Sequence, residues 1–154
     1  MKKYFLLLTL ITVAITSCKK SSSFDPAQQA AKDDAAIKAY ITANNIVATK
    51  DQSGLYYSVI TPGTGAYPTA SSTVNVNYTG KLLDGTVFAP TANLIQSLSG
   101  LIVGWQIGIP HINTGGRILL LIPSALGYGN NSPGASIPAN SVLIFTIDLI
   151  RFSN

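Results

Sequence analysis

The chain has 154 residues, of which 47% are apolar and 10% are charged, and its formal net charge is +4. This length accommodates one domain with short appendages, and the apolar fraction is sufficient for a hydrophobic core. The basic residues are scattered and form no patch or stripe, which excludes a surface built to bind nucleic acid.

Residues 1–17 have the layout of a secretory signal peptide. Two lysines precede an apolar run from Tyr4 to about Ile15, and small residues follow. This run is too short to cross the roughly 30 Å hydrocarbon core of a membrane as a helix. The ending ITSC resembles a bacterial lipobox, which implies cleavage before Cys18 and acylation of its thiol and of the new amino terminus.

Cys18 is the only cysteine, so no disulfide and no thiolate metal site can form within one chain. More than one acyl chain provides stable membrane anchoring. We therefore expect a lipoprotein of the bacterial cell envelope, anchored to a membrane at Cys18 on the periplasmic side or at the cell surface. The alternative is an ordinary secreted protein with an incidental free cysteine.

Residues 18–50 are predicted to form a lipidated tether followed by a helix over 26–45. The polar, Ser-rich start is typical of a flexible linker. Asp25 as N-cap and Pro26 at the first helical position mark the start of the helix. The helix could pack on the main domain, support a dimer or act as a stalk, and we favour packing or a spacer role. Its narrow apolar stripe consists of Ile37, Tyr40 and Ile41.

From about Asp51 the sequence changes to β patterns punctuated by Gly and Pro. Residues 73–80 alternate apolar and polar side chains, which predicts a half-buried antiparallel strand. Asp84-Gly85 predicts a tight turn after it, followed by a second strand that ends by residue 90. Residues 100–110 indicate a short helix that ends near the final proline. We predict an α+β domain built on an antiparallel sheet. Further strands are expected at 54–60, 115–123 and 141–150.

Conventional catalytic groups are scarce in this domain. His111 is the only histidine, it is expected on a turn after the short helix, and no nucleophile elbow is present. The six Asp residues do not cluster at metal-ligand spacing, and the glycines form no phosphate-binding loop, so we expect neither a metal nor a cofactor. An enzyme built on this chain would work without acids, nucleophiles or metals.

Three segments then occur in order with tight internal spacing: VNVNYTGKLLDGTVF at 74–88, LIVGW at 101–105, and IPSALGYG through IPANSVLIFTIDLI at 122–150. This pattern resembles the FKBP-type peptidyl-prolyl cis-trans isomerases over roughly residues 52–152. The resemblance implies a curved, mainly antiparallel sheet wrapped around one short helix, formed by residues 51–154. It also implies isomerisation of X–Pro bonds in unfolded or exported proteins.

The resemblance assigns an apolar pocket to this domain. Trp105 would form its floor, the Tyr128 hydroxyl would donate to a substrate carbonyl, and Ile102 could offer its backbone N–H to another. The implied catalytic residues are Tyr78, Phe88, Trp105, Tyr128 and Phe145. The implied substrate-binding residues are Leu94, Leu101, Ile102 and Ile137.

The chain departs from the family pattern after Phe88. The resemblance implies an Asp at the pocket rim, but Ala89 follows, and then Pro90. Residues 89–100 are expected to form a loop that is shorter than usual and free of charge, with Gln96 where bacterial relatives often have Phe. We expect isomerase activity that is retained but reduced.

Two alternatives to an isomerase stay open. The first is a non-catalytic FKBP-like lipoprotein that binds Pro-containing or unfolded segments as a chaperone. The second is a structural envelope protein in which the N-terminal helix mediates assembly and the pocket is vestigial.

Overall fold

The computed structural model describes residues 24–154, so the predicted signal peptide at 1–17 and the predicted lipidation site Cys18 lie outside them. The helices are α1 (Pro26–Ala43) and α2 (Val103–Gly108), with short 3-10 turns η1 (Leu98–Gly100), η2 (Ile109–His111) and η3 (Ser124–Leu126). The strands are β1 (Thr49–Lys50), β2 (Tyr56–Thr61), β3 (Thr73–Leu82), β4 (Val87–Ser97), β5 (Arg117–Ile122) and β6 (Leu143–Ser153).

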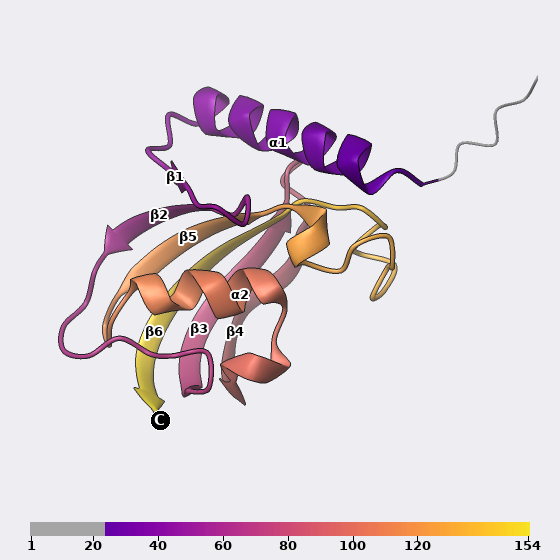
Figure 1. The fold of residues 1–154 in the computed structure, drawn as a ribbon. Helices are drawn as coiled ribbons and strands as arrows, with labels where there is room; N and C mark the ends of the chain where they lie inside the picture. Colours follow the sequence, from indigo (N-terminus) through magenta and orange to yellow (C-terminus); the bar gives the residue numbers. More distant parts are fainter. Residues whose placement is uncertain (1–23) are drawn as a thin grey trace, which may run out of the picture.

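The six strands form one open sheet in the order β1-β2-β5-β6-β3-β4, and every neighbouring pair is antiparallel. The strands bend around α2, which lies across one face of the sheet (Figure 1). This architecture confirms the predicted α+β class and the sheet wrapped around one short helix. No helix between residues 24 and 154 combines the length and the apolar character that a membrane crossing requires.

Side chains on the two faces of the sheet belong to two hydrophobic clusters. Because successive residues of a strand point to opposite faces, Leu143 and Phe145 of β6 join the cluster that contains Trp105 of α2. Ile144, between them, joins the cluster that contains Ile37 of α1. The sheet is therefore packed on one side by α2 and on the other by α1.

The start and the apolar stripe of α1 confirm the sequence prediction. Asp25 caps the helix, because its Oδ1 accepts the N–H groups of Ala27 and Gln28 at 2.9 and 3.3 Å. Ile37 is fully buried against the sheet, as expected for a helix that packs on the main domain. The rest of the predicted stripe is half-buried in the same cluster, at Tyr40 and Ile41.

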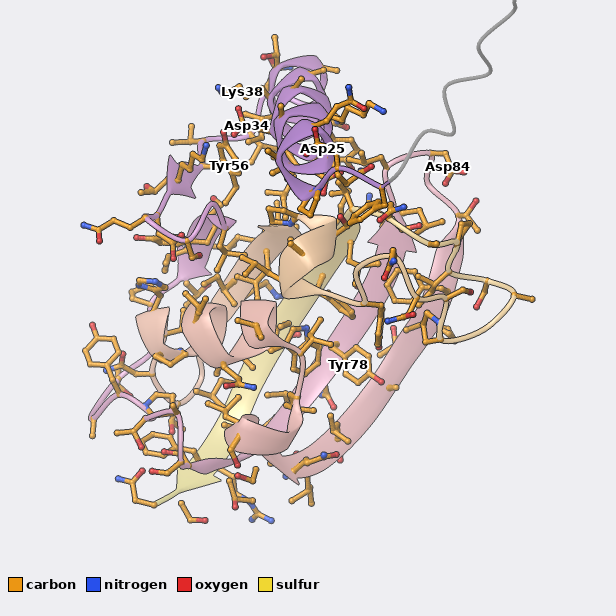
Figure 2. All side chains as sticks on the ribbon, turned by 45° about the vertical axis from the view of Figure 1, so that its right-hand side comes forward. Asp25, Asp34, Lys38, Tyr56, Tyr78 and Asp84 are labelled. Atoms are coloured by element: carbon orange, nitrogen blue, oxygen red, sulfur yellow. The ribbon has the colours of Figure 1, made fainter. Side chains whose placement is uncertain are left out.

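A polar contact also ties α1 to the strands beneath it. The Asp34 carboxylate accepts hydrogen bonds from the Lys50 ammonium at 2.5 Å and the Tyr56 hydroxyl at 2.7 Å, and it pairs with Lys38 at 2.7 Å. Asp34, Lys38 and Tyr56 lie together where α1 passes over β1 and β2 (Figure 2). The helix is thus attached by a buried apolar residue and by an ion-pair network at its edge.

The approach of α2 to the sheet depends on two glycines on one face of the helix. A Cβ added to Gly104 would lie 2.5 Å from Cγ2 of Ile122, and one added to Gly108 would lie 2.5 Å from Cδ2 of Leu120. Larger residues at these positions would push α2 away from β5. The glycines therefore set how deeply Trp105 enters the space enclosed by the sheet.

The expectation of a loop over residues 89–100 is wrong, because β4 continues to Ser97 and the η1 turn follows. Pairing with β3 runs along the whole strand, and Thr73 lies opposite Ser97 at its far end. Proline has no backbone N–H to donate to a neighbouring strand, so in sheets it occurs on edge strands or at bulges. Pro90 meets both conditions, because β4 is an edge strand and its pairing with β3 shifts register next to Pro90. Long-range pairing has overridden the local turn signal.

Candidate active site

One cavity of about 280 Å³ lies between the sheet, α2 and the long connection before β6. The structure brings together all nine residues that the resemblance assigns to a pocket, together with Ala89. None of the ten lining side chains carries a charge, so the space is apolar apart from the two tyrosine hydroxyls and the indole N–H. The lining residues are Tyr78, Phe88, Ala89, Leu94, Leu101, Ile102, Trp105, Tyr128, Ile137 and Phe145.

The walls of the cavity are aromatic rings packed edge to face. Phe145 is the central ring, with its centroid 5.1 Å from that of Trp105 and 5.4 Å from that of Phe88, at interplanar angles of 89° and 79°. Tyr78 packs on Trp105 at 5.1 Å and 80°, and it points from β3 into the space beside α2 (Figure 2). Such pairs contribute about 0.5–1.5 kcal/mol each beyond burial, so the rings hold each other in place.

Gly80 leaves room for these rings near the C-terminal end of β3. A Cβ at this position would lie 2.5 Å from Cε2 of Phe88 and 2.9 Å from Cε1 of Phe145. Only glycine lets both rings cover the strand at this point. This role of Gly80 is not predicted from the sequence, in which the Tyr-Thr-Gly motif at 78–80 is the only local signal for it.

Trp105 forms the floor of the cavity from the first turn of α2, and its side chain is buried. Its indole N–H has no hydrogen-bond partner within residues 24–154. Ile102 is the N-cap of the same helix, with backbone angles φ −59° and ψ 147°. Its carbonyl accepts the backbone N–H of Trp105 at 2.9 Å. The backbone of Ile102 therefore belongs to the cavity edge and to the helix start at once.

Tyr128 and Ile137 come from the connection between η3 and β6. Bonds across this connection hold its two sides together. The Gly129 carbonyl accepts the Asn140 N–H at 2.7 Å, and the Ser132 hydroxyl donates to the Ile137 carbonyl at 2.7 Å. Tyr128 is 38% exposed, so its ring reaches the cavity while solvent still has access to it.

Ala89 is the tenth lining residue of the cavity. It lies opposite Gly80 in the pairing of β3 with β4, next to Phe88. The signal that identifies it is its position directly after Phe88, where the resemblance implies an Asp. A methyl group therefore occupies the part of the wall where that carboxylate would stand.

His111 takes no part in the cavity lining. Its ring stacks on that of Tyr57, with centroids 4.1 Å apart and planes 9° apart. Within residues 24–154, no three His, Cys, Asp or Glu side chains gather closely enough to hold a metal ion. The cavity itself is lined by apolar surface, two tyrosine hydroxyls and the indole N–H of Trp105.

Comparison with known proteins gives matches over most of the chain. A family model described as FKBP-type peptidyl-prolyl cis-trans isomerase matches residues 65–150. A probable FKBP-type peptidyl-prolyl cis-trans isomerase of Haemophilus influenzae is 35% identical over 147 residues, which is 93% of this chain and 61% of that protein. The outer membrane protein MIP of Legionella longbeachae is 38% identical over 138 residues, 86% of this chain and 58% of that protein.

Solved structures agree with these sequence matches. The crystal structure of FkpA from Escherichia coli is similar with a TM-score of 0.70 and 35% identity, over 82% of this chain and 62% of that one. The chain spans about three fifths of the length of these three proteins.

Proposed function

The chain belongs to the FKBP-type peptidyl-prolyl cis-trans isomerase family, and we propose that it catalyses the cis–trans isomerisation of X–Pro peptide bonds. One observation carries this proposal. The nine residues that the family resemblance assigns to the pocket line a single uncharged cavity of about 280 Å³, which is large enough for a proline ring.

The reaction requires little conventional catalytic chemistry. Rotation about an X–Pro bond faces a barrier of about 18–20 kcal/mol, because amide resonance is lost as the bond twists. The twisted amide is less delocalised and less dipolar than the planar one. An apolar cavity therefore disfavours the planar ground state more than the twisted transition state, and this difference accelerates the step.

The lining residues divide into two roles in this mechanism. Trp105, Phe88 and Phe145 receive the proline ring and keep water from the amide. The Tyr128 hydroxyl donates a hydrogen bond to a substrate carbonyl, and the Ile102 N–H offers a second donor. These bonds hold the flanking peptide while the X–Pro bond turns.

The substrates we propose are X–Pro segments of unfolded or exported proteins in the bacterial cell envelope. Cleavage before Cys18 and acylation there would anchor the protein to a membrane, on the periplasmic side or at the cell surface. The resemblance of ITSC to a lipobox supports this, as does the similarity to a Legionella longbeachae protein named as an outer membrane protein.

A protease-coupled assay on a short X–Pro peptide, with the full chain purified in detergent, tests the proposed activity. We expect Phe88→Ala to lower kcat/KM about tenfold or more through lost apolar contact. Tyr128→Phe should lower kcat/KM about two- to tenfold, the value of one neutral hydrogen bond. Tyr67→Phe is the matched control, since it removes the same hydroxyl from a tyrosine that does not line the cavity. Folded wild-type protein that leaves the peptide's spontaneous rate unchanged would refute the proposal.

A second candidate function is a non-catalytic module that binds Pro-containing segments as a chaperone. Ala89 favours it, because the implied rim carboxylate is absent from the cavity wall. Trp105 is the only tryptophan and lies in the cavity, so its fluorescence reports peptide binding directly. Saturable quenching by an X–Pro peptide without rate enhancement would select this function over the isomerase.

The structural envelope protein is less consistent with the fold. Ile37, the centre of the apolar stripe on α1, is fully buried within its own chain and is not available for assembly. Oligomers that disappear when residues 19–50 are deleted would revive this alternative.

A further inference from the structure

Asp33 is a buried carboxylate that the proposed mechanism does not use. It lies on α1, outside the segment 65–150 that the family model matches, and its exposed fraction is 3%. Its Oδ2 accepts the backbone N–H of Ser124 at 2.8 Å and the Ser124 hydroxyl at 2.6 Å. Its Oδ1 accepts the side-chain amide of Gln29 at 2.7 Å. Both carboxylate oxygens of Asp33 thus accept hydrogen bonds, and Ser124 lies 91 residues further along the chain.

Ser124 in turn determines the path of the chain on both sides of Tyr128. It is the first residue of η3, and its carbonyl accepts the N–H of Gly127 at 3.0 Å and the N–H of Gly129 at 2.8 Å. These two donors flank Tyr128. Hydrogen bonds therefore connect α1 to Ser124, and Ser124 to the two chain neighbours of Tyr128, which carries a hydroxyl at the cavity.

We infer that Asp33 is a positioning residue for Tyr128, so that the helix preceding the family domain determines the geometry of the cavity rim. This inference rests on the proposed isomerase function. The physical reason is that Ser124 is itself buried, with an exposed fraction of 2%. Without the carboxylate its N–H would lack a partner, and a buried unpaired donor is costly enough for the turn to rearrange until it finds one. Tyr128, four residues along the chain, moves with that turn.

The test compares Asp33→Ala, Asp33→Asn and Asp34→Ala in the full chain, with the X–Pro peptide assay. We expect Asp33→Ala to lower kcat/KM about three- to tenfold, since small misplacements of a positioning contact have effects of this order or larger. Asp33→Asn keeps one acceptor oxygen for Ser124, so its kcat/KM should lie much closer to that of the wild type than to that of Asp33→Ala. Asp34→Ala is the matched control, because it removes the adjacent carboxylate and its contacts with Lys50 and Tyr56. It should change kcat/KM less than twofold.

A double-mutant cycle separates positioning from general loosening of the fold. In a Tyr128→Ala background, Asp33→Ala should have no further effect on kcat/KM, because the residue through which it acts is gone. An equal loss with and without Tyr128, or a loss in Asp34→Ala as large as in Asp33→Ala, would overturn the inference.

Amide hydrogen exchange gives a readout that does not depend on activity. We expect exchange at Gly127 and Gly129 to accelerate at least about tenfold in Asp33→Ala and to stay unchanged in Asp34→Ala, since only the first disturbs the turn held by Ser124. If the wild type proves inactive, the proposed function fails while this exchange pattern still decides whether Asp33 orders the Tyr128 turn. Should Asp33→Ala fail to fold, Ser124→Ala serves instead, because it removes only the hydrogen bond from the Ser124 hydroxyl to Asp33. We then expect exchange at Gly127 and Gly129 to accelerate by a smaller factor. Unchanged exchange at both glycines in these variants would overturn the inference.

Discussion

Ala89 is the residue at which the cavity differs from what the family resemblance implies. It stands on the wall next to Phe88, and no lining side chain is charged. An apolar wall suffices for the desolvation mechanism, but it provides no acceptor for the backbone N–H groups of a bound peptide. At the scale of single residues, we expect this position to influence how firmly a proline-containing peptide is held.

We expect Ala89→Asp to raise kcat/KM roughly tenfold, because a carboxylate at the rim can accept a charge-assisted hydrogen bond worth about 1.5–3 kcal/mol. The X–Pro peptide assay measures it. Ala92→Asp is the matched control, since it introduces the same charge on the same strand at a residue that does not line the cavity. A gain of equal size in both variants, or no gain at Ala89, would show that the rim carboxylate is not what this site lacks.

At the scale of elements, the position of α2 depends on its contact with β5. Gly104 and Gly108 face Ile122 and Leu120 so closely that no side chain fits between them. The same contact places Trp105 at the cavity floor. The close contact between α2 and β5 therefore determines both how the helix packs and where Trp105 lies in the cavity.

Gly104→Ala should lower the free energy of unfolding by roughly 1–2 kcal/mol, because overpacking against the stiff, β-branched Ile122 outweighs the better helix propensity of alanine. Urea denaturation measures the change. Gly134→Ala is the control, since a Cβ there meets no atom within 4 Å and the backbone is not left-handed. It should leave stability unchanged within about 0.5 kcal/mol. Equal stabilities for both variants would contradict the close approach of α2.

The docking of α1 makes a second prediction at this scale, through the pH dependence of stability. Hydrogen bonds from the Lys38 and Lys50 ammonium groups hold the pKa of Asp34 well below its usual value of 3.8. Burial, and then the hydrogen bond to Asp34, raise the pKa of Tyr56 from 10 to about 12. The lowered pKa of Asp34 contributes stability that is fully present above pH 3.8, the usual carboxyl pKa, and is lost as the pH falls below that value towards the pKa in the folded protein. The raised phenol pKa contributes stability that is present below pH 10 and lost as the pH rises through about 12.

We therefore expect the difference in unfolding free energy between wild type and Tyr56→Phe to be constant between about pH 4 and pH 10 and to shrink between pH 10 and about 12. The difference between wild type and Asp34→Asn should be constant between about pH 4 and pH 10 and shrink below about pH 4. Urea titrations at a series of pH values measure both. Tyr67→Phe, at an exposed tyrosine, should show no such pH-dependent difference. Differences that stay flat across the whole range would show that this network does not hold α1 in place.

At the scale of the whole molecule, the sheet is packed on both faces, and the helix next to the proposed anchor is one of the two layers. Ile37 and Asp33 are both buried in contact with the main domain. The proposed membrane anchor at Cys18 would therefore be joined to the domain through a docked helix, with only the short segment from Cys18 to Asp25 between them.

We expect Cys18→Ser to move the protein from the membrane fraction to the soluble fraction and to abolish incorporation of labelled palmitate, because the thiol is the proposed acylation site. Fractionation of cells that express each form measures this. Ser22→Ala, in the same polar segment, is the control and should leave both readouts unchanged. A Cys18→Ser protein that stays in the membrane fraction and still incorporates palmitate would refute the lipoprotein proposal.

Much of the fold follows from local patterns. The alternation at 73–80, the turn at Asp84-Gly85 and the capping of α1 by Asp25 all appear in the structure where the sequence predicts them. The pocket residues were assigned through the resemblance, since an aromatic residue in a strand has the same local pattern whether it lines a site or fills a core. The strand that follows the Asp84-Gly85 turn was predicted only as far as Pro90, because proline is a local signal against a strand, and its continuation to Ser97 depends on the pairing with β3.

Local sequence patterns were enough to predict the class of the domain, which is a β-rich fold with one short internal helix. The close approaches at Gly80 and Gly104 and the bonds between Asp33 and Ser124 became visible only in the folded chain. The physical reason is separation along the chain. Propensity and periodicity act over a few residues, whereas these contacts form when strands and helices far apart in sequence pack together. A buried carboxylate on a polar helix therefore has no local signature.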